Sequence, residues 1–270
     1  MILSSKRRPA RGFTLMELMV TMAVLSVILV LALQVTESSR NAIRTSEGLS
    51  VNDAIARRAF DQIARDISQM IVREDARIEF KSQSGNDKLA FLTHARGLTG
   101  SEAVGERSVS LVSYELSRDT ALGEQFVRGS RGHQFDDGAA DALSLDPTQP
   151  FPAIAPDNLQ PVSNKIIRFE VEYLIQGPTG ITREIAPPDT SENLRGLVVS
   201  LVTLDDRGRK AIRPAGISDL AEEFTDATSS KNTLETWSKT RDDLTKSGYP
   251  GVSREILQSI RCYQRTVLTP

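Results

Sequence analysis

Residues 18–35 read LMVTMAVLSVILVLALQV and contain no charged side chain. The apolar stretch that begins at Phe13 and ends at Val35 measures about 35 Å as a helix, at about 1.5 Å per residue. That length spans a hydrocarbon core of about 30 Å once. No comparable apolar run follows in the sequence. The stretch therefore predicts a single membrane-spanning helix near the N-terminus.

The residues before the apolar stretch predict its orientation. Residues 1–12, MILSSKRRPARG, carry four basic side chains and no acidic one. Because basic flanks stay on the cytoplasmic side, we expect a cytoplasmic N-terminus and an exported segment over 36–270. A cleavable secretory signal also has a basic start, but its apolar core is shorter and ends at an A-x-A-like site. The sequence disfavours that alternative.

Glu17 lies inside the apolar stretch. An unpaired carboxylate at such a position costs roughly 2.5–3.5 kcal/mol on insertion scales. A simple anchor gains nothing from this residue. Its presence predicts a cationic partner within the bilayer.

Residues 11–18, RGFTLMEL, resemble the cleavage and methylation signal of type IV prepilins and type II secretion pseudopilins. The resemblance implies that residues 1–12 are a leader peptide, cut by prepilin peptidase between Gly12 and Phe13. Phe13 would then become an N-methylated N-terminus. The resemblance also implies that Glu17 pairs with the N-terminal amine of a neighbouring subunit during assembly, which would supply the missing cation.

An amphipathic pattern follows the apolar stretch. Apolar residues recur at three- to five-residue steps and alternate with charged ones, which predicts a helix with one buried face. No proline occurs between Pro9 and Pro147, so one helix over about 13–72 is expected. Its membrane half is 13–35 and its amphipathic half is 36–74; a coiled-coil or bundle helix is the alternative for the second half. The apolar stripe consists of Val51, Ile55, Phe60, Ile63, Ile67, Met70 and Ile71.

The remaining residues, 75–270, predict an exported globular head. Alternating segments indicate antiparallel strands, with a hairpin turn at Asp205-Asp206-Arg207-Gly208 and a long loop over 130–164. The predicted fold class is α+β, with a pilin-like N-terminal helix packed on an antiparallel β-sheet head and extra C-terminal helices. The predicted strands are 76–81, 88–93, 108–116, 124–129, 165–175, 181–185, 196–204 and 209–213, and the predicted helices are 217–224, 234–246 and 253–260.

The order of these elements over about 13–213 resembles the J-type minor pseudopilin of type II secretion. The C-terminal helices depart from that pattern. Longer J-like pilins of this kind accompany the gene clusters called Verru_Chthon cassettes, which is a second resemblance.

Composition argues against several other classes of protein. The net charge of −2 argues against nucleic-acid binding, and a single cysteine, Cys262, excludes an intrachain disulfide. The two histidines, His94 and His133, lie near no nucleophile motif, so no catalytic residue, cofactor or metal site is predicted. An acidic segment within the 130–164 loop could hold calcium, but its spacing favours a solvated turn. That segment contains Asp136, Asp137, Gly138, Asp141 and Asp146.

The sequence thus predicts a non-enzymatic structural subunit, a minor (tip or priming) pseudopilin of a type II secretion-like system. It would sit in the inner membrane with a periplasmic head and then enter a pseudopilus or pilus. The implied partners are other pilins or pseudopilins through the N-terminal helix, prepilin peptidase and an inner-membrane assembly platform. The alternatives are a minor type IV pilin for adhesion, motility or DNA uptake, and a membrane-tethered binding or enzymatic domain.

Overall fold

The computed structural model describes residues 14–72, 78–81, 86–94, 109–117, 124–132, 154, 156–186, 188, 191–226 and 232–270. The chain divides into two units, 1–47 and 48–270, each described by itself. The predicted fold class is confirmed: a long N-terminal apolar helix is followed by antiparallel sheets and C-terminal helices.

The first element is the 54-residue helix α1 (Leu15–Ser68), which lies within the expected range of 13–72. Leu15–Arg40 is the one helical stretch in the described residues that is long and apolar enough to cross a membrane, and none of it is buried. From residue 52 onward the helix buries one face. Val51, the first residue of the predicted stripe, is 44% exposed and does not belong to the buried face. That face begins at Asn52.

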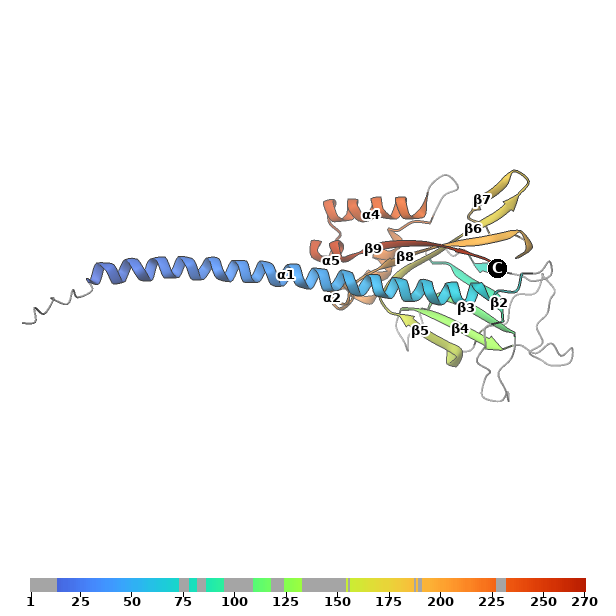
Figure 1. Cartoon of the computed structure of the whole chain (residues 1–270), viewed down its shortest axis with the longest axis horizontal. Helices are drawn as coiled ribbons and strands as arrows, with labels where there is room; N and C mark the ends of the chain where they lie inside the picture. The colour runs from blue at the N-terminus through green and yellow to red at the C-terminus, as the bar shows by residue number, and fades with distance from the viewer. Residues whose placement is uncertain are drawn as a thin grey trace, which may run out of the picture. The chain divides into compact units, whose positions relative to one another are not determined.

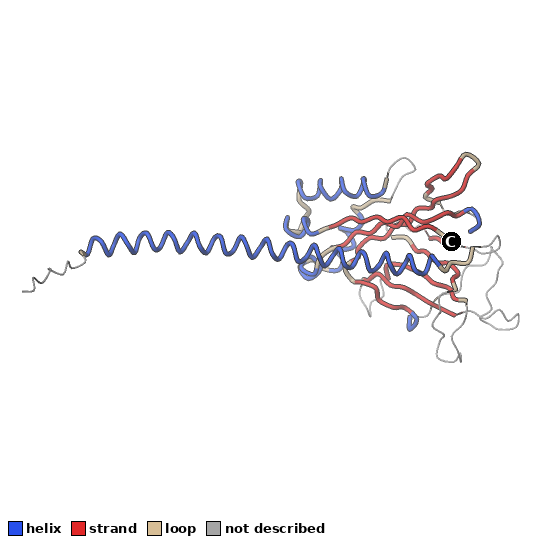
Figure 2. The backbone as a smooth tube through the Cα atoms, viewed as in Figure 1, coloured by secondary structure: helices blue, strands red, loops and turns tan. Residues whose placement is uncertain are grey.

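The described strands, drawn in red in Figure 2, form two antiparallel sheets rather than the single sheet that the sequence suggested. The first has the order β1-β2-β3-β4-β5 and the second β7-β6-β8-β9. The first sheet consists of β1 (Ile78–Lys81), β2 (Lys88–Thr93), β3 (Ser110–Ser117), β4 (Gln125–Gly132) and β5 (Leu159–Ser163). The second consists of β6 (Ile166–Gly177), β7 (Gly180–Glu184), β8 (Leu194–Thr203) and β9 (Arg261–Leu268).

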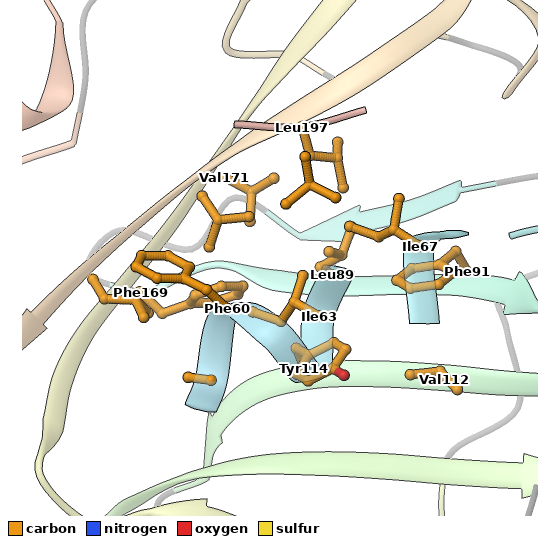
Figure 3. Packing of buried hydrophobic residues seen from close by; sticks show 14 of the residues in the cluster. Phe60, Ile63, Ile67, Leu89, Phe91, Val112, Tyr114, Phe169, Val171 and Leu197 are labelled. Carbon is orange, nitrogen blue, oxygen red and sulfur yellow. The ribbon is translucent and has the colours of Figure 1, made fainter. Parts of the chain in front are cut away.

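The main core joins the buried face of α1 to both sheets. Phe60, Ile63 and Ile67 of α1 recur at helical spacing and are almost wholly buried. Burial of each such side chain stabilises the fold by about 1.5–3 kcal/mol before entropy. Figure 3 shows them against Leu89, Phe91, Val112 and Tyr114 of the first sheet and Phe169, Val171 and Leu197 of the second.

Helices form a second core on the other face of the second sheet. They are α2 (Asp206–Ala211), α3 (Pro214–Glu222), α4 (Thr233–Ser247) and α5 (Arg254–Ser259), and two short 3-10 helices, η1 (Pro156–Asn158) and η2 (Ser191–Asn193), complete the elements. Figure 1 shows α4 and α5 beside β8 and β9. Trp237 of α4 is fully buried there, stacks edge-on against Phe224 and donates a hydrogen bond to the carbonyl of Thr225. It anchors α4 to the second sheet, in the core that contains Ile167 of β6 and Val202 of β8.

The predicted turn at 205–208 and strand at 209–213 are wrong, because this segment is helix α2. The side chain of Asp205 accepts a hydrogen bond from the backbone N–H of Gly208 at 2.8 Å, which caps the helix. A hairpin turn of this kind requires a glycine with positive φ, and Gly208 does not have one. It is small because a Cβ atom there would lie 2.6 Å from Leu204 and 2.9 Å from Ile256. Close packing, and not a turn, requires glycine at this position.

Two further predictions need correction. The segment 130–164 is not loop throughout: β4 extends to Gly132 and β5 occupies Leu159–Ser163. Within this segment, Ile154 packs against a small apolar cluster of the first sheet, made of Ala90, Leu92 and Leu111. The C-terminal strand β9 was not predicted at all, although it pairs with β8 over eight residues.

Candidate functional site

The start of α1 carries the glutamate that the sequence singled out. Glu17 lies one turn from Thr14, and the two residues bond reciprocally. The backbone N–H and the hydroxyl of Thr14 each donate to Oε2 of Glu17 at 3.3 Å, and the N–H of Glu17 donates to Oγ1 of Thr14 at 3.2 Å. This arrangement is a capping box, which satisfies free donors at a helix N-terminus. Gly12 and Phe13 lie outside the described residues.

The apolar half of α1 is exposed on every side. Its large aliphatic side chains from Leu15 to Val35 are between 50% and 79% exposed. A continuous apolar surface of this kind does not remain in water, because lipid or protein normally covers it. The segment is therefore built for contact with a membrane or with other helices.

A buried charge cluster fixes the amphipathic half of α1 to the first sheet. Asp66 of α1 accepts hydrogen bonds from Nε of Arg128 on β4 at 2.6 Å and from its Nη2 at 3.1 Å. The phenol of Tyr114 on β3 also donates to Asp66. Burial, and then the charge of Asp66, raise the pKa of Tyr114. All three side chains are almost completely buried, so the cluster selects one position of the helix.

The C-terminal segment holds the same helix from the other side. The side-chain amide of Asn52 donates to the carbonyl of Ser259 at 3.2 Å. Tyr263 of β9 donates to Asp53 at 2.5 Å, and Arg265 of β9 pairs with Asp61 at 2.6 Å. Sequence reasoning missed these contacts because it missed β9. The available signal was the enrichment of the segment in aromatic and β-branched residues, Tyr263, Thr266 and Val267.

The remaining candidate residues do not gather in one place. In the described ranges no three His, Cys, Asp or Glu side chains converge as metal ligands. His94 is exposed after β2, while His133 and the acidic segment 136–146 lie outside the described residues. Cys262 packs against the second core, and burial raises the pKa of its thiol to about 12. A thiol with so high a pKa carries almost no thiolate at neutral pH.

Residues 7–33, a range that contains Gly12, Phe13 and Glu17, match the prokaryotic N-terminal methylation motif. The curated proteins include no match. Among solved structures, a type IV-like pilin from Thermus thermophilus is similar at 15% identity and a TM-score of 0.39, covering 82% of this chain and 95% of that chain.

The methylation motif and the exposed apolar helix overlap in the sequence. The matched range coincides with the start of the exposed apolar helix, and the capping box lies inside it. These features are consistent with the type IV pilin and pseudopilin family, and the chain is pilin-like in carrying the prokaryotic N-terminal methylation motif on an exposed apolar helix.

Proposed function

We propose that this chain is a minor (tip or priming) pseudopilin of a type II secretion-like system, assembled through its N-terminal helix. In this proposal residues 1–12 are a leader, 13–35 span the inner membrane, 36–74 form the amphipathic half of the helix, and 75–270 form a periplasmic head. One observation carries the proposal: the methylation motif over 7–33 includes the start of the apolar helix, of which Leu15–Arg40 has no buried part.

Glu17 has the chemistry for assembly. Both hydrogen bonds from Thr14 go to Oε2, so among the described contacts Oε1 is left to accept another donor. Cleavage before Phe13 would create an ammonium group four residues away in each subunit. In a low-dielectric surrounding, an ammonium from a neighbour pairs strongly with this carboxylate. Glu17 would therefore select an incoming subunit in addition to capping its own helix.

The head supports a low-copy role. Beyond the two sheets it carries a second core with four helices. A large head suits a tip or priming position better than a densely repeated shaft, where every neighbour must fit. Prepilin peptidase and an inner-membrane assembly platform are the partners that this role requires.

Processing is the first test. Full-length chain co-expressed with a prepilin peptidase should yield a mature form that starts at an N-methylated Phe13, read by intact mass and N-terminal peptide analysis. Gly12→Val should block the cut, because it removes the glycine after which the resemblance places the cleavage. A mature form starting at Met1 or after Ala32 would contradict the proposal.

Assembly is the second test. Glu17→Ala should be cleaved and inserted normally but should not crosslink to partner pilins, since the neighbouring ammonium then lacks its carboxylate. Glu37→Ala is the matched control, because this acid lies in the same helix outside the apolar stretch. Normal crosslinking of the Glu17→Ala chain would remove the assembly role of Glu17.

A further inference from the structure

One buried arginine of the second sheet is only partly paired. Arg168 on β6 bonds Asp226 through Nη2 alone, while its Nε and Nη1 are buried and have no hydrogen-bond partner in the described part of the head. Arg128 and Arg183, by contrast, each hold an acid through both Nε and Nη2. Buried donors without acceptors are costly, so Arg168 has the capacity and the energetic reason to bind a second acceptor.

Asn86 and Asp87, which precede β2, bond β6 next to this arginine. At an edge of β6 that β7 leaves open, the N–H of Phe169 donates to Oδ1 of Asn86 at 3.2 Å and the N–H of Asp87 donates to the carbonyl of Phe169 at 3.1 Å. The N–H of Val171 donates to Oδ2 of Asp87 at 2.8 Å. Asp87 therefore ties the start of β2 to β6, one residue along the strand from Arg168.

The charges that act on Asp87 are unbalanced. Burial is the main cause that raises its pKa to about 8, and the charges of Glu170 and Asp226 add to the rise. The hydrogen bond from Val171 and the charge of Arg168 oppose it. Two acids and one guanidinium thus surround a carboxyl that holds its proton at neutral pH. The remaining titratable groups on the adjoining strands are Tyr173, Lys88 and Glu115, of which the last two pair with each other.

Ionisation of Asp87 changes which acid needs the guanidinium more. Asp87 is only 3% exposed, so its carboxylate would have little water around it. The side chain of Asp226 is 39% exposed and can be hydrated instead. Because a buried charge is costly unless it is paired, Arg168 gains more by turning its unpaired Nε and Nη1 to Asp87 than by keeping Asp226.

We propose that loss of the Asp87 proton to solvent moves Arg168 from Asp226 to Asp87, and that residues 225–226 then separate from the second sheet. While Asp87 is protonated, Asp226 ties the segment after α3 to β6. Once Asp87 is ionised, that tie is lost and the end of α3 presents a different surface. The inference goes beyond the proposed function, since it concerns a contact inside the head and does not depend on assembly.

Trp237 reports on this segment directly. It is the only tryptophan of the chain, its indole N–H donates to the carbonyl of Thr225 at 2.8 Å, and its ring lies edge-on to Phe224. Burial raises the pKa of Cys262 and of all four tyrosines above their ordinary values. These groups therefore do not titrate between about pH 7 and about pH 9, and a change of Trp237 emission in that range does not come from them.

The test follows the emission of Trp237 in the folded full-length chain in detergent, without denaturant, over the same pH range. We expect one step to longer wavelength with a midpoint near pH 8, because the indole loses Thr225 and gains water. Asp87→Asn keeps an acceptor for Val171 but cannot ionise, so its emission should stay at the low-pH value throughout. Asp242→Asn, which changes an exposed acid on the same helix as Trp237, is the matched control and should keep the step.

A second variant and a second measurement decide the question even if Asp87→Asn does not fold. Asp226→Ala removes the partly exposed partner and should give the high-pH emission at every pH. In the unaltered chain, the amide exchange protection of Phe224 and Thr225, corrected for base catalysis, should fall about tenfold as Asp87 ionises, the factor that loss of a hydrogen bond to a charged group produces.

Two outcomes would overturn the inference. The first is a pH step that persists in Asp87→Asn or in Asp226→Ala. The second is an unaltered chain that shows neither the step nor the loss of protection. Neither readout involves cleavage or assembly, so a negative result leaves the proposed function intact.

Discussion

The two halves of α1 are continuous in backbone but opposite in the surface they present. From Leu15 to Val35 the aliphatic side chains are exposed on every side, whereas from Asn52 to Ile67 one face is buried and the opposite face stays polar. The first half has no partner within the described chain and relies on lipid or other helices. The second half has its partners in the two sheets. A single helix can therefore serve two environments, with a different source of stability for each half.

The largest expected effect separates a buried charge from an exposed one on the same helix. Asp66→Ala leaves the Arg128 guanidinium buried and unpaired, and should destabilise the head by about 3–5 kcal/mol. Asp61→Ala breaks an exposed pair with Arg265 and should cost about 0–1 kcal/mol. Urea unfolding of the full chain in detergent, followed by the fluorescence of Trp237, measures both. Equal losses would mean that the cluster around Asp66 does not hold the helix.

A second experiment compares aliphatic side chains from the two halves. Ile63→Ala removes a fully buried side chain and should destabilise the head by about 2–5 kcal/mol. Leu25→Ala, in the exposed half, should leave the Trp237-monitored transition unchanged, because its side chain is 61% exposed and so contributes little buried area. If Leu25→Ala lowered the head's unfolding free energy, the two halves would not be independent.

The unfolding free energy of the head should depend on pH through a buried aspartate. Burial is the main cause that raises the pKa of Asp87 from 3.8 to about 8, and its carboxyl accepts a hydrogen bond from the N–H of Val171. The folded state then holds a proton that the unfolded state has released. This contribution is fully present below about pH 4 and is lost as pH rises to about 8, on the order of 1 kcal/mol per pH unit.

Asp87→Asn isolates that effect. The variant carries no titrating carboxyl at position 87. Its unfolding free energy should therefore fall less between pH 5 and pH 8 than that of the unaltered chain. This pH range lies between the unfolded and folded pKa values of Asp87, roughly 4 and 8. Urea midpoints at both pH values give the comparison. Identical pH profiles would place the Asp87 carboxyl in an environment more like water.

The smallest effect concerns the start of the helix. Thr14→Ala removes the hydroxyl half of the capping box and should cost about 1 kcal/mol locally. We expect faster amide hydrogen exchange in the first turn of α1 and no change in the Trp237 transition. A shift of the Trp237 transition would mean that the stabilities of the two halves of α1 are coupled.

Prediction from sequence succeeded where a pattern is local and periodic. The N-terminal apolar run, the helical spacing of Phe60, Ile63 and Ile67, the alternation in β6 and the nearly continuous apolar residues of β8 each follow from one segment of chain. It failed where the local signal was ambiguous. The Asp205–Gly208 segment has the composition of a turn, but the same Asp caps α2 and the same Gly packs under Leu204.

The sequence by itself determined the N-terminal motif, the exposed apolar helix and the α+β class, because each depends on residues adjacent along the chain. Only the tertiary structure decided that the head has two sheets, that β9 forms one edge of the second sheet, and that Asp66, Tyr114 and Arg128 meet. Asp66 and Arg128 are 62 positions apart, and Tyr263 and Asp53 are 210. Contacts at such separations arise from the packing of whole elements, and no local pattern encodes that packing.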